Sequence, residues 1–255
     1  MVELSSDSQG LSSKVCKSFR FKKTEPKRTL TREEQKEFMR TLKNHSIWSD
    51  YYGVFVVLFG TGCRMCEVAG LTWNDIDFEN NVININHSVI YRQDENRKTV
   101  YMISEPKTKK GYRTIPMLHS VREVLEEEKE KQKNHENTFS VDGYTNFVFL
   151  RPNKMGFYSN SFRNVIRRVV DDYNESIGDD KKKLPYFSVH QTRHTFASRM
   201  YEANVQDKVI QEILGHSNIS VTLDIYTDIA SRQKEDAMVK IDLDKILNEE
   251  ENVDR

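Results

Sequence analysis

The stretch from Asp50 to Gly60, DYYGVFVVLFG, constrains the fold of this chain more than any other segment. Its apolar residues cover nearly every side of a helix instead of a single stripe. A helix that is apolar all round is stable in water only when it is buried all round. We therefore predict that this segment forms a core helix, and a chain of 255 residues is long enough to bury one.

Helical patterns occur on both sides of this segment. Thr31-Arg-Glu-Glu34 has the form of a capping box and predicts a helix that runs to about Lys43. A second capping box, Ser188-Val-His-Gln191, places His190 in the first turn of a later helix. That later helix is expected at 190–203, and the other expected helices cover residues 64–70, 118–130, 159–173, 207–214, 220–226 and 231–248.

The middle of the chain is strand-like. Asn81–Asn86, NVININ, alternates apolar and polar residues as a half-buried strand does. We expect a small antiparallel meander with a turn at Lys109–Gly111, and a separate short strand at 148–150. Its segments are 81–86, 89–91, 100–103 and 113–115. The predicted fold is therefore mainly α-helical with a small antiparallel β-meander (α+β).

The charge of the chain is unevenly distributed. Its 39 Lys and Arg balance 39 Asp and Glu, so net charge alone does not indicate a nucleic-acid-binding protein. Residues 14–32, however, hold eight basic side chains and one acidic one, whereas residues 231–255 hold five basic and eight acidic ones. We interpret residues 1–28 as a basic flexible arm or linker remnant that could contact phosphates. A solvated linker is an equally good interpretation. Candidate phosphate contacts are Lys22, Lys23, Lys27 and Arg28 in the arm, and Lys109 and Lys110 in the expected turn.

The composition also bears on the compartment. No stretch approaches the ~20 apolar residues of a membrane span, and the N-terminus lacks the apolar centre of a signal peptide. Cys16, Cys63 and Cys66 cannot form a disulfide framework, and Cys63-Arg-Met-Cys66 has no second pair with which to complete a zinc site. These features predict a cytoplasmic protein with free cysteines.

One helix carries a set of candidate chemical groups. In His190-Gln-Thr-Arg193-His194, the first histidine and the arginine share a helix face, since they are three residues apart. The two histidines, with His216, could be metal ligands, but Gln191 stands where zinc hydrolases need a glutamate base. An arginine on the same face favours an anion, and a guanidinium fits a phosphate well.

Two other segments carry basic groups. Arg64 follows Gly62 at the expected start of a helix, where an anion is favoured, although an ordinary ion pair with Glu67 is the commoner arrangement at this spacing. Lys107 lies on an expected basic hairpin, EPKTKKGYRTIP, from which it could donate a proton. Solvated lysines are the simpler interpretation of that hairpin.

Taken together, these groups suit phosphodiester chemistry without a metal or other cofactor. The two arginines could neutralise the non-bridging phosphate oxygens. Tyr226 would attack phosphorus, with His190 orienting or accepting its proton, and His216 could hydrogen-bond a phosphate oxygen. Lys107 would protonate the departing sugar oxygen. The candidate catalytic residues are Arg64, Lys107, His190, Arg193, His216 and Tyr226.

The sequence resembles the catalytic domain of the tyrosine recombinases, the phage-integrase family, and in particular integrases of conjugative transposons. The motifs that carry the resemblance are T-G-x-R-x-x-E at 61–67, the lysine hairpin at 106–116, H-x-x-R-H-T-F-A-S at 190–198, L-G-H at 214–216, and Tyr226. They extend over about residues 29–230. The resemblance implies DNA cleavage and rejoining through a 3′-phosphotyrosine, with Glu67 supporting the site. It also implies double-stranded DNA as the partner rather than a small-molecule substrate or a membrane.

One departure from the family pattern leaves alternatives open, as does the C-terminal tail. Only about 28 polar residues precede the match, where relatives place a DNA-clamping domain, so we also consider a non-catalytic DNA-binding remnant or regulator. Topoisomerase IB-like cleavage without synapsis is a further alternative, and a metal-dependent hydrolase is a distant one. Residues 231–255 resemble the tail helix that family members exchange between protomers, which would support a tetramer on DNA; docking within one chain is equally open.

Overall fold

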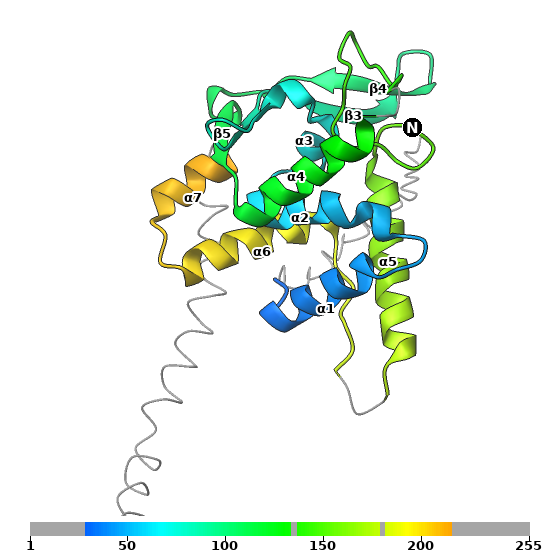
Figure 1. Cartoon of the computed structure of the whole chain (residues 1–255). Coiled ribbons are helices and arrows are strands. Elements are labelled where there is room, and N and C mark those ends of the chain that lie inside the picture. The colour runs from blue at the N-terminus through cyan, green and yellow to red at the C-terminus, as the bar shows by residue number, and fades with distance from the viewer. Residues whose placement is uncertain (1–28, 134–136, 179–181, 216–255) are drawn as a thin grey trace, which may run out of the picture.

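The computed structural model describes residues 29–133, 137–178 and 182–215 (Figure 1). Its α-helices are α1 (Arg32–Lys43), α2 (Tyr52–Thr61), α3 (Met65–Gly70), α4 (His119–Gln132), α5 (Ser159–Ser176), α6 (Val189–Glu202) and α7 (Asp207–Leu214). Its strands are β1 (Ile76–Asp77), β2 (Val82–Ile85), β3 (Ser88–Gln93), β4 (Thr99–Ser104) and β5 (Arg113–Pro116). Short 3-10 turns cover Ser49–Tyr51, Trp73–Asp75 and Lys109–Gly111. The expected helices at 220–226 and 231–248 lie outside the described residues, as does the N-terminal arm.

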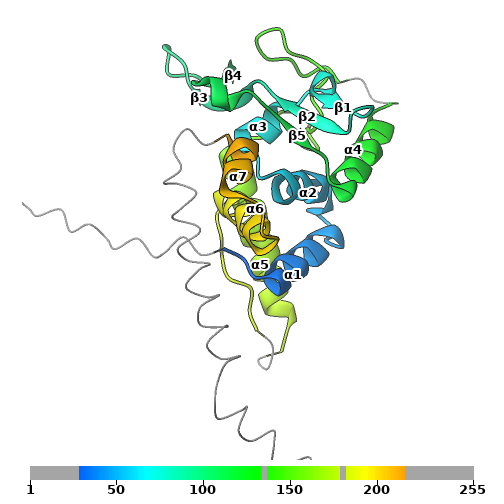
Figure 2. The ribbon, with the colours of Figure 1, turned by 90° about the vertical axis from the view of Figure 1, so that its left-hand side faces the viewer.

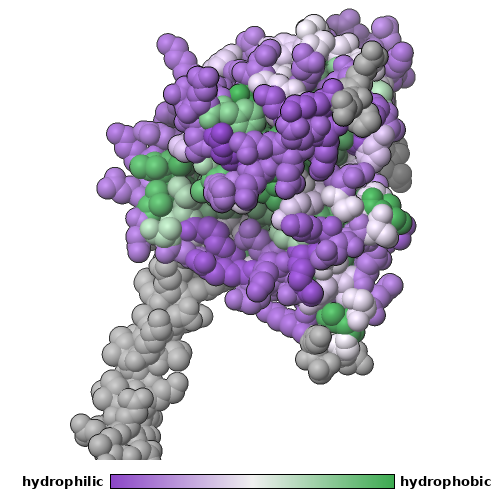
Figure 3. Space-filling view, viewed as in Figure 1, coloured by the Kyte–Doolittle hydropathy of each residue, from purple (hydrophilic) through white to green (hydrophobic). Residues whose placement is uncertain are grey.

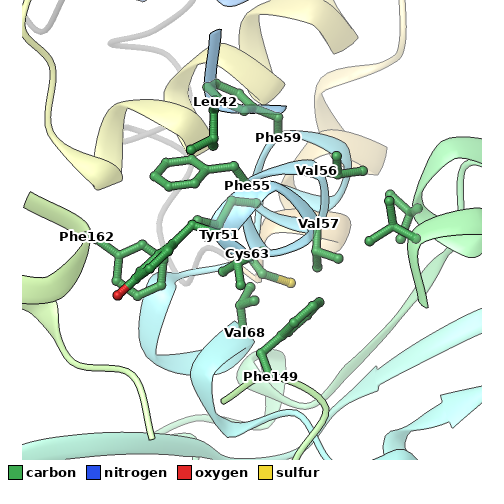
Figure 4. Packing of buried hydrophobic residues seen from close by; sticks show 14 of the residues in the cluster. Leu42, Tyr51, Phe55, Val56, Val57, Phe59, Cys63, Val68, Phe149 and Phe162 are labelled. Atoms are coloured by element: carbon green, nitrogen blue, oxygen red, sulfur yellow. The ribbon is translucent and has the colours of Figure 1, made fainter. Parts of the chain in front are cut away.

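Helix α2 is the core helix that its composition predicts. Its side chains pack on several sides at once, and Phe55 and Val57 are fully buried. The ring of Phe55 meets Phe38 of α1 and Phe162 of α5 edge-on, with centroids 5.2 Å and 5.9 Å apart. Figure 4 shows aromatic and aliphatic side chains from several elements around this helix. Burying one Leu- or Phe-sized side chain contributes about 1.5–3 kcal/mol, so this cluster is a main source of stability.

The first helix begins as predicted. The Thr31 hydroxyl accepts a hydrogen bond from the Glu34 backbone N–H (3.2 Å), and the Glu34 carboxylate accepts one from the Thr31 N–H (3.0 Å). This reciprocal capping box satisfies two backbone donors that a helix start leaves without partners. The buried face of α1, with Phe38 and Leu42, then packs against α2 and α5.

The strands do not form one meander, and this expectation was wrong. Strand β2 pairs antiparallel with β1 and β5, while β3 pairs only with β4 in a separate two-stranded sheet. The physical reason is that the two sheets cover different clusters. Ile83 of β2 and Ile115 of β5 face the main core, whereas Val89 of β3 belongs to a second cluster with Phe139 and Phe147.

The expected strand at 148–150 is also absent from the structure. Phe147 makes an isolated antiparallel bridge to Thr72, and the Val148 N–H donates to the Leu71 carbonyl at 2.7 Å. This single bridge fastens the segment to the turn after α3 without extending into a ladder. Phe149 is nevertheless buried, so the apolar run packs in the core as a loop.

The two sheets and the long helix α5 lie on different sides of α2. In Figure 2 the strands gather at one end of the molecule and α1 at the other, with α2 between them. Helix α6 packs against α2, and α7 contacts both α6 and β5. This places the C-terminal end of α7 beside the segments that precede α3 and β5. None of the helices in the described ranges is long and apolar enough to span a membrane.

Candidate active site

Arg193 of α6 is the most buried charged residue of the candidate set, with 2% of its surface exposed. Its Nη1 donates to the Gly62 carbonyl at 2.9 Å, and its Nη2 donates to the Leu214 carbonyl at 2.5 Å. These carbonyls stand at the C-terminal ends of α2 and α7, where backbone acceptors lack helical partners and the helix dipole is negative. One guanidinium therefore supplies hydrogen-bond donors to two helix C-termini that are far apart in the sequence.

Both helix ends require glycine. Gly62 and Gly215 have φ values of 64° and 65°, a left-handed conformation that L side chains seldom adopt. A Cβ on Gly62 would lie 2.4 Å from Cδ1 of Phe196, and one on Gly215 would lie 2.9 Å from the Lys110 carbonyl oxygen. The chain thus turns sharply at a tightly packed glycine at each of the two helix ends that Arg193 contacts.

Glu67 of α3 links two further arginines. Its carboxylate accepts hydrogen bonds from the backbone N–H and Nη1 of Arg64 (2.7 and 2.8 Å) and from Nη1 and Nη2 of Arg113 (3.1 and 2.8 Å). Burial alone would raise the pKa of this carboxyl. The hydrogen bonds and charge of Arg113, followed by those of Arg64, outweigh burial and lower the pKa to about 2. Glu67 is therefore an anion at neutral pH.

Arg64 stands one residue earlier than expected relative to its helix. We placed it in the first helical turn, but α3 begins at Met65 and Arg64 is the N-cap. The ion pair with Glu67 that its spacing suggested is present, at 2.8 Å. The Arg64 side chain is still 40% exposed, whereas that of Glu67 is 8% exposed. Arg64 is thus anchored on its inner side and open to solvent on its outer side.

Arg113 is a site residue that sequence reasoning missed. It lies on β5, its side chain is 5% exposed, and besides Glu67 it contacts the carbonyls of Ile213 (2.7 Å) and Gly111 (3.3 Å) and the Cys63 sulfur (3.7 Å). A signal for it was available. Arg113 precedes the core residue Ile115 by two positions, and residues two apart in a strand face the same side. An arginine in line with a core position must be buried with a partner.

The cluster carries more positive than negative charge. Among the described residues, the carboxylate of Glu67 pairs directly with Arg64 and Arg113, and the guanidinium of Arg193 lies near enough to interact with it electrostatically. Burial lowers the pKa of Arg193, the charge of Arg64 lowers it further, and the result is about 9 in spite of Glu67. Such a buried cation is stabilised when an anion arrives, because the anion offsets the charge that burial leaves without compensation.

The cysteines next to the cluster are free thiols. Cys63 is buried and Cys66 is partly buried, as expected of cysteines that act as small apolar side chains. Burial raises the pKa of the Cys63 thiol to about 11, with Glu67 adding to the effect. Cys63 therefore stays protonated at neutral pH. Cys16 lies outside the described residues.

The segment with Lys107 is not a hairpin. It connects β4 to β5, which belong to different sheets, and passes through the predicted turn at Lys109–Gly111. Lys107, Lys109 and Lys110 are exposed. The Lys110 carbonyl lies close to Gly215, so the connection reaches the end of α7.

The two histidines of α6 differ in their surroundings. His190 is exposed in the first turn of the helix, as predicted, while His194 is buried. Their rings meet edge-on with centroids 4.7 Å apart. Within the described ranges, no three His, Cys, Asp or Glu side chains gather as a metal site requires. His216 and Tyr226 lie outside those ranges, as do the arm residues Lys22, Lys23, Lys27 and Arg28. The structure therefore brings together Arg64, Glu67 and Arg193.

Comparison with known proteins identifies relatives of the whole described region. The profile of the Phage integrase family matches residues 28–233. The transposase from transposon Tn916 of Enterococcus faecalis is 32% identical over 232 residues, 91% of this chain and 54% of the transposase. A tyrosine recombinase XerC-like protein of Caldanaerobacter subterraneus is 31% identical over 217 residues, 82% of this chain and 52% of that protein. The chain thus spans about half the length of these curated relatives.

A solved structure shows the same fold. The Tn1549 transposon integrase in complex with transposon right end DNA is similar with a TM-score of 0.70 and 35% identity, covering 84% of this chain and 67% of that chain. This agrees with the mainly helical architecture and the small antiparallel sheets described above. The chain belongs to the phage integrase family of tyrosine recombinases and has the fold of their catalytic domain.

Proposed function

We propose that this chain cleaves and rejoins DNA strands through a covalent 3′-phosphotyrosine at Tyr226. The observation that carries the proposal is the surplus positive charge around Glu67 and Arg193, next to an arginine that remains open to solvent. A phosphodiester supplies the missing negative charge and offers non-bridging oxygens with the spacing of a guanidinium fork. Stabilising the charge that develops on such oxygens is the largest contribution most enzymes make to this kind of step.

The chain's own residues account for each atom that moves. The Tyr226 oxygen forms a bond to phosphorus, and its proton goes to His190. The bond between phosphorus and the 5′ oxygen breaks, and that oxygen takes a proton from Lys107. Arg64 and Arg193 hold the non-bridging oxygens, and His216 donates to one of them. The reverse sequence rejoins the strand, and the covalent bond conserves the energy so that no nucleotide cofactor is consumed.

Double-stranded DNA is the proposed substrate, and site-specific recombination in a mobile element is the proposed setting. Relatives named as a transposase and as an integrase in complex with transposon DNA support both. The basic residues Lys22, Lys23, Lys27, Arg28, Lys109 and Lys110 are proposed to contact the phosphate backbone. We propose that the protein acts on DNA in the cytoplasm.

An apolar groove offers a place for assembly on DNA. It has a volume of about 730 Å³ and is lined by Met39, Val56, Phe59, Phe196, Met200 and Ile213, with Arg32, Lys36 and Arg199 also on its wall. Figure 3 shows apolar surface gathering on this face over α6 and α7 and between α6 and α4. We propose that the tail of a neighbouring copy, residues 231–248, docks here. The apolar residues of this tail could pack against the apolar lining of the groove, and its acidic residues could pair with the three basic side chains on the groove wall.

The assembly proposal is tested by sedimentation of the protein on nicked DNA. Met200→Asp in the groove, or a chain that ends at residue 230, should reduce the complex to single bound subunits. Met155→Asp is the matched control, because this methionine is exposed outside the groove. Tetramers that survive both the groove substitution and removal of the tail would refute the proposed contact.

The cleavage proposal is tested with a nicked suicide DNA substrate in EDTA, followed by a denaturing gel. We expect a protein–DNA adduct that disappears in Tyr226→Phe. DNA binding without any adduct would contradict the proposal and favour the non-catalytic DNA-binding alternative. Cleavage abolished by EDTA would favour the metal-dependent hydrolase. Relaxation of supercoiled plasmid without exchange between two duplexes would indicate the topoisomerase-like alternative.

A further inference from the structure

Arg113 uses every donor it has inside the protein. A guanidinium carries five N–H groups, one on Nε and two on each Nη. Here Nε donates to the Ile213 carbonyl, Nη1 to Glu67 and the Gly111 carbonyl, and Nη2 to Glu67 and the Cys63 sulfur. Five acceptors therefore match five donors. No N–H remains for a phosphate, so Arg113 cannot serve as a DNA ligand in this arrangement.

The acceptors of Arg113 come from the segments that carry the proposed catalytic groups. Glu67 holds Arg64. Gly111 ends the turn on the Lys107 connection, and Ile213 lies in the last turn of α7, just ahead of His216. The Arg113 stem also fills the space at the α7 corner, because a Cβ on Gly215 would lie 3.0 Å from Arg113 Cδ.

We propose that Arg113 is a positioning residue. It orients Arg64 through Glu67, and it fixes the positions of the Lys107 connection and the end of α7 relative to Arg64. This inference rests on the proposed strand-cleavage function. Arg113 neutralises one side of the Glu67 carboxylate, so Arg64 does not have to neutralise it alone. Arg64 can then keep its outer N–H groups toward solvent, where a phosphate would bind.

Removing the Arg113 guanidinium should redirect Arg64. In Arg113→Met, Glu67 would keep Arg64 as its one direct cation, with Arg193 and the Cys63 thiol near it. Arg64 would then be drawn inward and lost to the phosphate. In Arg113→Lys, a point charge would still neutralise Glu67, but it could not reach Ile213 and Gly111 at the same time, because a lysine lacks the fork.

The first test separates cleavage from binding. Single-turnover adduct formation on suicide DNA should fall about 100-fold in Arg113→Met, since a misplacement of about 1 Å has an effect of this size. The Kd for DNA should change far less than the cleavage rate, because Arg113 itself makes no phosphate contact and only the Arg64 contact with the phosphate is affected. Arg122→Met is the matched control: Arg122 also binds a carbonyl (Phe78) and a carboxylate (Glu126), but on α4. It should leave the cleavage rate unchanged.

The second test follows the Glu67 carboxyl by NMR titration and needs no enzymatic activity. The pKa of Glu67 should rise clearly in Arg113→Met and stay low in Arg113→Lys and Arg122→Met. The acid limb of the cleavage rate should move upward in pH with it. If Arg113→Met does not fold, Arg113→Lys carries the test, with slower cleavage at an unchanged Glu67 pKa.

The outcomes distinguish the two proposals. If the wild-type chain forms no adduct, the strand-cleavage function fails, and the Glu67 titration still decides whether Arg113 controls this carboxylate. If the wild type cleaves but Arg113→Met and Arg113→Lys cleave at the wild-type rate, the positioning role is wrong. It is equally wrong if the Glu67 pKa in Arg113→Met stays where the wild type has it.

Discussion

Replacing Glu67 with glutamine tests the electrostatic account of the site without DNA. The substitution keeps the shape of the side chain but removes the charge shared by Arg64 and Arg113, and it turns an amide NH₂ toward their donors. The pKa of Glu67 is about 2 against an ordinary value of 4.5, which converts to about 3 kcal/mol of stability. Breaking one partner of a buried ion pair commonly costs about 3–5 kcal/mol, so the two estimates agree.

The assay is urea unfolding of Glu67→Gln and wild type at pH 7, 5 and 3.5. At pH 7 the variant should be less stable by about 3 kcal/mol, a decrease in Tm of about 6–12 °C for a domain of this size. A carboxyl whose pKa is lowered on folding contributes fully above its unfolded pKa and loses the contribution as the pH falls toward its folded pKa. The difference between the two proteins should therefore hold from pH 7 to pH 5 and shrink between about 4.5 and 2.

The control is Glu37→Gln on α1. Glu37 forms the same kind of i, i+3 pair with an arginine, Arg40, but on the surface, where such pairs contribute less than about 1 kcal/mol. It should leave stability almost unchanged at every pH. The account would be refuted if Glu67→Gln were as stable as the wild type at pH 7, or if its deficit stayed constant down to pH 3.5.

Three further predictions concern the same corner of the fold. Gly62→Ala should lower the free energy of unfolding, measured with urea, by about 2–4 kcal/mol, because this position has a left-handed φ and the new Cβ would clash with Phe196. In the control Gly143→Ala, φ is 84° but the space around the Cβ is open, so the loss should be only about 1–2 kcal/mol. Arg193→Lys should lose cleavage and at least about 2 kcal/mol of stability, because an ammonium cannot bind both helix-end carbonyls; a variant with wild-type melting would contradict this. Inorganic phosphate should raise the Tm of the wild type and raise it less in Arg64→Gln, and an equal rise in both would show that the anion binds elsewhere.

The sequence predicts the parts of this fold that depend on local signals. The apolar run in α2, the capping boxes at Thr31 and Ser188, and the glycine helix ends at Gly62 and Gly215 each follow from a few neighbouring residues. The pairing of the strands does not follow from neighbouring residues. The two sheets separate because Val89 faces one cluster and Ile83 another, and this depends on Phe139 and Phe147, some 50 residues farther along the chain.

The candidate site divides in the same way. Arg64, Glu67 and Arg193 were found because their motifs are short and ordered along the chain, and the structure brings them together. Arg113 was missed because its contacts come from segments as far as 100 residues away. The second role of Arg193, closing the ends of α2 and α7, is likewise visible only when both helices are in place.

The central claim is that Tyr226 becomes covalently joined to DNA, and mapping that bond tests it most directly. The wild-type chain would be trapped on a nicked suicide duplex in EDTA, digested with a protease and a nuclease, and its nucleotide-bearing peptide sequenced by mass spectrometry. We predict one modified residue, Tyr226, carrying a 3′-linked nucleotide, and no modified peptide from Tyr226→Phe. A nucleotide on another residue, or a cleaved strand with no peptide attached, would contradict the account.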